Sequence, residues 1–195
     1  MADLDYSRYG VQGGDWGAVV ASKIGSAHAG RVAGIHINMA ISPPLPGAAD
    51  DEAQRPFVEA RDAFQAAETG YNHVQRTKPQ SLAVAQSDSP AGLAAWITEK
   101  FRTWSDCDGD IESVYTKDQL LTNIMFYWAP NSVASSARIY YEASRDPASF
   151  AYPPVAVPTA VADFPKEIYR APQSWLEPRY NLKRYTSFER GGHFA

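Results

Sequence analysis

The stretch from residue 9 to residue 39 constrains the fold of this chain most strongly. It begins with a short segment, Tyr9–Gln12, that contains an aromatic and a β-branched residue, and the glycines of QGGDWGA follow at once. A helix-competent run, Ala18–Ile24, comes next and ends near Gly25, and the segment Arg31–Met39 is rich in valine and isoleucine. Strand, tight turn, helix and strand within roughly 40 residues predict a βαβ unit, which implies a parallel sheet.

The turn between the first strand and the helix places an acid between glycines. Asp15 is the central residue, with Gly13 and Gly17 two positions away on either side. We expect both glycines to let the backbone turn sharply without side-chain clashes, so that Asp15 projects into a cavity. The backbone N–H of Trp16, at the N-terminus of the helix, is placed to contribute to an oxyanion hole. A carboxylate in this position suits attack on carbon with formation of an ester. A plain aspartate turn or helix cap is the alternative interpretation.

A mostly helical block separates this unit from two further strand-like segments. Helices are expected over 51–69, over 90–104 with Ser89 in front, from Asp118 to Trp128, and over 135–146, where Arg138 and Glu142 have the spacing of a helical ion pair. Strands are expected over 155–164 and from Lys183 onward, before a glycine turn that ends at Phe194. The predicted organisation is an α/β core in two pieces, 1–43 and 151–195, with a helical insertion at 44–150.

The last part of the chain supplies a histidine and two acids. His193 stands in RGGHF, directly after the last predicted strand, and the segment after the preceding strand offers Glu167 or Asp163. Nucleophile, acid and histidine, in this order, form the catalytic triad of an α/β-hydrolase. Without this context, His193 would be interpreted as a surface-loop histidine. The order and the positions after strands favour a triad of Asp15, Glu167 or Asp163, and His193.

Several longer motifs carry a resemblance to a known family. They are YGVQGGDWG, GYNHVQRTKPQSLAVAQSDSPAGLAAWITEKFRTWSD, LLTNIMFYW, SSARIYYE, FPKE and RGGHFA. In this order they resemble the microsomal-type epoxide hydrolases of the α/β-hydrolase superfamily, over nearly the whole chain. The resemblance implies a partial α/β-hydrolase fold, with parallel sheet strands, a nucleophile elbow and an inserted helical lid at 44–150.

The resemblance also implies roles for individual residues. Asp15 matches the nucleophile, His193 the histidine that activates water, and Glu167 the acid that orients it, with Asp163 as the second choice. Tyr71 and Tyr140 match the two lid tyrosines that protonate the epoxide oxygen, and Tyr141 is a weaker candidate than Tyr140. The implied reaction opens a small hydrophobic epoxide with water to a vicinal diol, through an aspartyl ester and without a cofactor or metal.

Two other functions remain open at this point. Haloalkane dehalogenases also use an elbow aspartate, but their chemistry needs N–H donors for a halide rather than a pair of phenols. The other alternative is a non-catalytic fragment. About 14 residues precede Asp15, two residues follow His193, and the His-Gly-x-Pro motif of the second oxyanion-hole N–H does not occur. We therefore expect a fragment without the N-terminal strands and the closing helix, poorly soluble alone and with little or no turnover.

Composition limits the remaining function classes. The chain has 195 residues, a hydrophobic fraction of 45% and a formal net charge of −4, which fit one globular domain and give no reason to expect nucleic acid or an anionic membrane as partner. A single cysteine, Cys107, excludes an internal disulfide and a cysteine-based zinc site. His28, His36 and His73 lack metal-ligand spacing and are interpreted as structural. No apolar run is long enough to span a bilayer, so we expect a soluble, cytoplasmic protein that can form a homo-oligomer.

Overall fold

The computed structural model describes residues 1–151 and 153–195, in two compact units. Unit 1 consists of Met1–Phe64, Tyr152–His193 and Ala195, and unit 2 consists of Gln65–Ala151 and Phe194. Tyr152, at the point where the helical pattern is expected to stop, lies outside the described residues.

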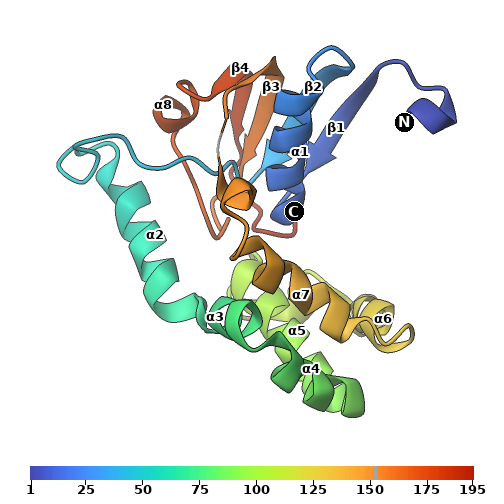
Figure 1. Ribbon diagram of the computed structural model, residues 1–195. Helices are drawn as coiled ribbons and strands as arrows, with labels where there is room; N and C mark the ends of the chain where they lie inside the picture. The colour runs from blue at the N-terminus through green and yellow to red at the C-terminus, as the bar shows by residue number, and fades with distance from the viewer. Residues whose placement is uncertain (152) are drawn as a thin grey trace. The chain divides into compact units, whose positions relative to one another are not determined.

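Unit 1 is built on a parallel sheet (Figure 1). Its strands are β1 (Tyr9–Gly13), β2 (Val32–Asn38), β3 (Val155–Asp163) and β4 (Tyr180–Ser187), in the spatial order β1-β2-β3-β4. Helix α1 (Trp16–Ala27) connects β1 to β2, so the predicted βαβ unit is confirmed, and α1 extends two residues beyond Gly25. The two strands predicted in the second piece of the core are confirmed as β3 and β4.

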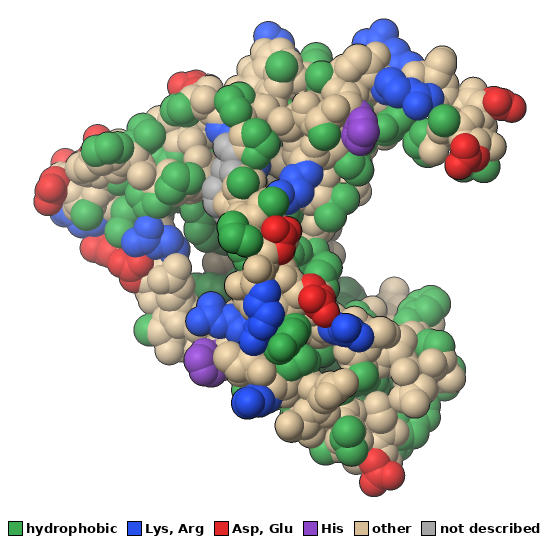
Figure 2. Space-filling view, viewed as in Figure 1, with side chains coloured by type: hydrophobic (Ala, Val, Ile, Leu, Met, Phe, Trp, Pro, Cys, Tyr) green, Lys and Arg blue, Asp and Glu red, His purple; other side chains and the backbone are tan. Residues whose placement is uncertain are grey.

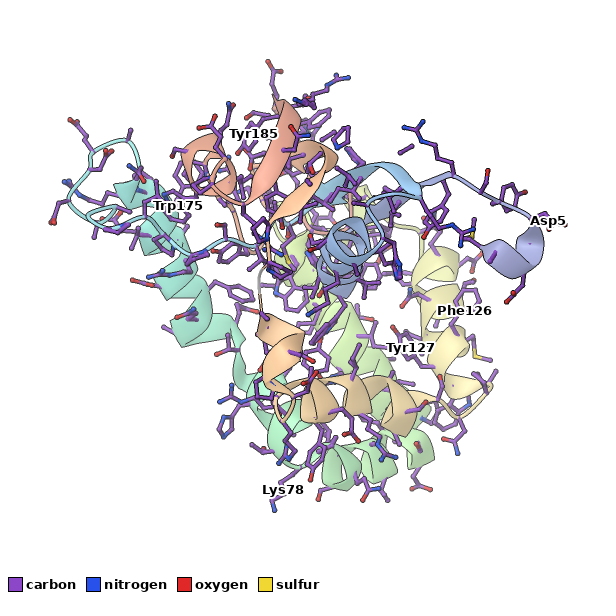
Figure 3. All side chains as sticks on the ribbon, turned by 45° about the horizontal axis from the view of Figure 1, so that its top comes forward. Asp5, Lys78, Phe126, Tyr127, Trp175 and Tyr185 are labelled. Carbon is purple, nitrogen blue, oxygen red and sulfur yellow. The ribbon has the colours of Figure 1, made fainter. Side chains whose placement is uncertain are left out.

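One face of the sheet packs against α1. Ala18 and Ala21 of α1 are buried with Ile35 and Ile37 of β2 and Val157 of β3. Small residues on α1 allow the close approach, because a Cβ at Gly25 would lie 3.0–3.3 Å from side chains of β2 and β3. The short helix α8 (Gln173–Leu176) adds Trp175, labelled in Figure 3, which is almost completely buried.

The opposite face of the sheet is open over its middle. Gly10, Gln12 and His36 are exposed there, whereas their neighbours on β1 and β2 face the core. These residues line a shallow hollow of about 420 Å³ that runs across the four strands. Parallel sheets normally have both faces covered, so this face is available for packing against another element or another molecule.

Unit 2 is helical, as predicted for most of this segment. Its helices are α3 (Gly70–Thr77), α4 (Pro79–Asp88), α5 (Pro90–Trp104), α6 (Lys117–Trp128) and α7 (Val133–Ala143), and α2 (Arg55–Glu68) leads into it from unit 1. Ser89 caps α5, because its Oγ accepts a hydrogen bond from the N–H of Gly92 at 3.0 Å. The predicted ion pair between Arg138 and Glu142 is confirmed at 2.9 Å. Among the described residues, no helix combines the length and apolarity that crossing a bilayer requires.

Candidate active site

The strand-to-helix turn at Asp15 is a strained elbow. Asp15 follows the end of β1 at Gly13 and precedes the start of α1 at Trp16, and it has a φ of 50° and a ψ of −128°. Residues other than glycine rarely adopt such angles, at a cost of about 1–3 kcal/mol. The side chain of Asp15 keeps 40% of its surface exposed. Asp15 is therefore accessible to a small molecule.

The two glycines around Asp15 contribute in different ways. A Cβ at Gly13 would lie 2.3 Å from the backbone carbonyl of Gly17, so only glycine fits at position 13, as predicted. A Cβ at Gly17 would have no neighbour within 4 Å. The expectation that Gly17 also avoids a side-chain clash is wrong. The backbone of Gly17 packs against Gly13 and leaves no room for a Cβ there, whereas a side chain at Gly17 would clash with nothing nearby.

His193 is held in a tight turn by its glycine neighbours. Gly191 has a φ of 118°, and a Cβ there would lie 2.5 Å from the ring of Phe164, so glycine is required. The N–H of Lys166 donates to the carbonyl of Gly191 at 3.0 Å, which ties this turn to the segment after β3. That segment carries Glu167. The turn therefore brings the histidine that follows β4 next to the acid that follows β3.

Asp15, His193 and Glu167 lie at the carboxyl ends of β1, β4 and β3, and they form one hydrogen-bonded line. Nε2 of His193 lies 3.0 Å from Oδ2 of Asp15, and its Nδ1 lies 2.6 Å from Oε1 of Glu167. The side chains of His193 and Glu167 are 4% and 3% exposed. The N–H of Ile168 also donates to Oε1 of Glu167 at 2.8 Å. The arrangement thus runs from an accessible carboxylate, through a buried imidazole, to a buried carboxylate.

Two carboxylates in contact with one imidazole favour its charged form. Burial alone would lower the pKa of His193, but the hydrogen bond to Asp15, the hydrogen bond to Glu167 and the charges of both carboxylates outweigh burial. Together they raise the pKa of His193 from 6.5 to about 9. His193 is therefore an imidazolium at neutral pH, and both of its ring nitrogens donate hydrogen bonds.

Asp163, the second choice for the acid, has other partners. Both oxygens of Asp163 accept hydrogen bonds from Arg170, at 2.8 and 2.7 Å, and Oγ of Ser187 donates to one of them at 3.2 Å. The carboxylate accordingly raises the pKa of Arg170, chiefly through these hydrogen bonds. Asp163 is held in a structural ion pair, and His193 contacts Glu167. This geometry supports Glu167 as the orienting acid.

The predicted lid tyrosines lie together in unit 2. The rings of Tyr71 on α3 and Tyr140 on α7 are edge to face, with centroids 5.8 Å apart. Trp104 lies 5.3 Å from the ring of Tyr71, and Nζ of Lys100 lies 5.2 Å above both of these rings. Tyr141 instead carries the guanidinium of Arg145 on its ring at 3.4 Å. Tyr140, rather than Tyr141, forms the pair with Tyr71.

Two sets of contacts, one in each unit, were not predicted from the sequence. Asn38, the last residue of β2, donates from Nδ2 to the carbonyl of Ala195 at 3.4 Å and lies 3.7 Å from where a Cβ of Gly14 would be. In unit 2, Oε2 of Glu68 lies 3.5 Å from Nζ of Lys100 and accepts from Nε1 of Trp104 at 3.2 Å. These contacts join residues far apart in the sequence, and no short motif reveals them.

The described part of the chain contains no cluster of three or more histidine, cysteine or acidic side chains that could hold a metal ion. His28, His36 and His73 are exposed.

Comparisons with known proteins agree with the motifs. No protein-family model matches the chain. It is 41% identical to a protein of Stigmatella aurantiaca provisionally named an epoxide hydrolase, and 36% identical to epoxide hydrolase 1 of Oryctolagus cuniculus. Both alignments include the whole chain, which covers 44% and 49% of these relatives. The chain therefore spans about half the length of the curated relatives that it matches.

The solved structures give the same result for the fold. The juvenile hormone epoxide hydrolase of Bombyx mori superposes with a TM-score of 0.89 at 34% identity, and the epoxide hydrolase of Aspergillus niger superposes with a TM-score of 0.84 at 25% identity. The whole chain is matched in each case, against 52% and 50% of the solved chains. The predicted partial α/β-hydrolase fold is confirmed, and so is the predicted resemblance.

Proposed function

We propose that this chain, which has the sequence and fold of the epoxide hydrolases over about half of their length, opens an epoxide to a vicinal diol through an ester on Asp15. The observation that carries the proposal is the line from the exposed carboxylate of Asp15 through His193 to Glu167, at 3.0 and 2.6 Å. The nucleophile is accessible, and the two groups that support it are buried. This order suits a covalent intermediate followed by attack of water.

In the first step, an oxygen of Asp15 attacks a ring carbon and the carbon–oxygen bond of the epoxide breaks. The carboxylate is already ionised, so attack needs no general base. The alkoxide that forms takes a proton from Tyr71 or Tyr140. A tyrosine phenol in water has a pKa of about 10, so phenols as a class suit proton donation at neutral pH. We propose this role for the tyrosines, and the role of the lid for unit 2, from the family resemblance and from the pairing of the two rings at 5.8 Å.

The second step follows from the change in charge at Asp15. Esterification removes the negative charge that Nε2 of His193 contacts, so the pKa of His193 falls and the imidazolium gives up its proton. The phenolate takes up one proton and becomes a phenol again. The neutral imidazole then takes a proton from water, and the hydroxide attacks the ester carbonyl. The backbone N–H of Trp16, at the start of α1, stabilises the resulting oxyanion. The oxyanion then collapses, the ester carbon–oxygen bond breaks, and the departing alkoxide takes the proton of the new carboxyl group. The diol is released, and the carboxylate of Asp15 and the imidazolium of His193 are restored.

The paired phenols of Tyr71 and Tyr140 support an epoxide rather than a haloalkane as substrate. A dehalogenase needs N–H donors for the departing halide, whereas ring opening of an epoxide leaves an alkoxide that needs a proton. The paired phenols have the chemistry that an alkoxide requires.

Diol formation from styrene oxide tests the proposal. We would measure it with the 195-residue chain, and with an extended protein in which the unmatched part of the Stigmatella relative is joined to the chain. We expect Asp15→Asn to abolish turnover. Asp5→Asn is the matched control, because Asp5 also has a positive φ, of 58°, and is exposed at the N-terminus, away from the sheet (Figure 3). The proposal would be contradicted if Asp15→Asn and Asp5→Asn lost turnover equally. It would also be contradicted if Asp15→Asn kept full turnover in whichever of the two proteins, the 195-residue chain or the extended protein, is active.

A further inference from the structure

Unit 2 contains a cavity that the proposed reaction does not use. It has a volume of about 560 Å³ and lies between the junction of α3 and α4 and one side of α7, from Ala134 to Tyr141. Tyr141 is one of its lining residues, whereas Tyr140 pairs with Tyr71. Consecutive residues of a helix point about 100° apart, so the cavity lies on a different side of α7 from the tyrosine pair. Its function is therefore separate from the proposed proton donors.

The charged side chains that line the cavity are basic. They are Lys78 and Arg138, and no carboxylate belongs to the lining. Glu142 is the nearby acid: its Oε1 accepts from Nε of Arg138 at 2.9 Å, so the pair uses one edge of the guanidinium and leaves its terminal nitrogens as donors. Figure 2 shows Lys and Arg side chains gathered over α3 and α7, and Figure 3 shows Lys78 extending from the end of unit 2. With Arg138 paired to Glu142, Lys78 gives the cavity an excess positive charge, in a chain whose net charge is −4.

Two helices also begin at the same cavity. Gln80 and Ser81, in the first turn of α4, and Ala134 and Ser135, in the first turn of α7, are lining residues. Neither helix has a side chain that caps its N-terminal N–H groups. Each such helix end carries a partial positive charge and outward-facing donors. The partial positive charges of the two helix ends add to the charges of Lys78 and Arg138. The backbone N–H groups of the two first turns offer hydrogen-bond donors from two directions.

We propose that this cavity binds a phosphate group, either of a soluble phosphate monoester or of a lipid headgroup. A phosphate presents several acceptor oxygens in a tetrahedral arrangement and carries nearly two negative charges at neutral pH. It can accept from Lys78, from the terminal nitrogens of Arg138 and from both helix ends together. A carboxylate has two oxygens in one plane and one charge, and it leaves part of this donor set unused.

The test is a titration of the ¹⁵N-labelled 195-residue chain, followed by NMR, with inorganic phosphate and with glycerol 3-phosphate at constant ionic strength. We expect saturable amide shifts at Gln80, Ser81, Ala134 and Ser135, with an apparent Kd of about 1 mM. Sedimentation with phosphatidylcholine vesicles, with and without phosphatidic acid, distinguishes the two sources. Binding to the acidic vesicles assigns a lipid headgroup, and binding of the soluble phosphates alone assigns a free phosphate monoester.

Variants decide whether the shifts come from this cavity. Lys78→Met and Arg138→Met should each weaken binding about tenfold, since each removes a charged hydrogen-bond donor. Lys117→Met, at an exposed lysine of α6, is the matched control and should bind as the parent does. Ser135→Glu places a carboxylate in the cavity from an exposed position and should abolish binding. Shifts that do not saturate, that spread over the chain, or that persist unchanged in Lys78→Met and Ser135→Glu would overturn the proposal.

Discussion

Replacing Asp15 by asparagine should lower the pKa of His193 by a measurable amount. Two carboxylates contact the imidazole, at 3.0 and 2.6 Å, and the pKa of His193 is raised from 6.5 to about 9 against the opposing effect of burial. That shift corresponds to about 3 kcal/mol, at about 1.4 kcal/mol per unit. Asp15→Asn keeps the shape of the side chain and removes one of the two charges. We expect the pKa of His193 to fall by about one to two units.

The measurement is the NMR titration of the His193 ring proton in the parent chain, in Asp15→Asn and in the control Asp5→Asn. The same loss of charge occurs when Asp15 becomes an ester. The titration therefore measures the fall in the pKa of His193 that lets its imidazole act as a base in the second step. A pKa that stays near 9 in Asp15→Asn would refute the reasoning, and so would a pKa near 6.5 in the parent chain.

The raised pKa also makes stability depend on pH. The folded chain binds the His193 proton more tightly than the unfolded chain does. The resulting stabilisation is fully present below pH 6.5 and is lost as the pH rises through about 9. Relative to a His193→Gln variant, the parent chain should therefore lose about 3 kcal/mol of unfolding free energy over this window. Urea denaturation of both proteins below pH 5.5 and above pH 10, about one unit outside each limit, measures the difference.

Three further predictions concern the structure around the site. Gly13→Ala should destabilise the chain by about 3 kcal/mol or more, because the new Cβ would lie 2.3 Å from the backbone of Gly17. Gly17→Ala should change stability by about 1 kcal/mol or less, because its Cβ would have no neighbour within 4 Å. Urea denaturation of both variants measures the difference, and equal effects would contradict the elbow geometry. Asp163→Asn should lower the free energy of unfolding by roughly 2 kcal/mol or more, because it leaves Arg170 without its carboxylate partner. The pKa of His193 should stay near 9 in this variant. A His193 pKa as low as in Glu167→Gln would instead assign the orienting role to Asp163. The chain should self-associate through β1 and the open face of the sheet, and light scattering measures this association. Gln12→Lys, on that face, should reduce it. A monomer at all concentrations would contradict the prediction.

The sequence predicts elements where local signals agree. The βαβ unit is recognisable because glycines separate a short apolar strand from a helix, and a run rich in valine and isoleucine follows. Helix α5 is recognisable because Ser89 and Pro90 mark its start and apolar residues repeat at helical spacing. Helices α3 and α4 were not predicted individually. Their sequence, GYNHVQRTKPQSLAVAQSD, has few large apolar residues and so no clear apolar repeat at helical spacing. Both helices pack against α7, and these contacts stabilise them in the folded chain.

The candidate site shows the same limit. The order of Asp15, Glu167 and His193 along the chain predicts a triad, but it cannot choose between two acids four residues apart. That choice rests on Arg170, which occupies Asp163 through a contact that only the folded chain makes. The contact between Asn38 and Ala195 joins residues 157 positions apart. No spacing rule along the sequence indicates a pair of that kind.

The most direct test of the central claim is the mass of the His193→Gln variant after incubation with styrene oxide. Without the imidazole, the ester on Asp15 forms but is not hydrolysed, so it should accumulate. We expect a mass increase equal to one molecule of the epoxide, located on the peptide that contains Asp15 and absent in the double variant with Asp15→Asn. An unmodified protein that still produces diol, or an adduct on a different residue, would contradict it.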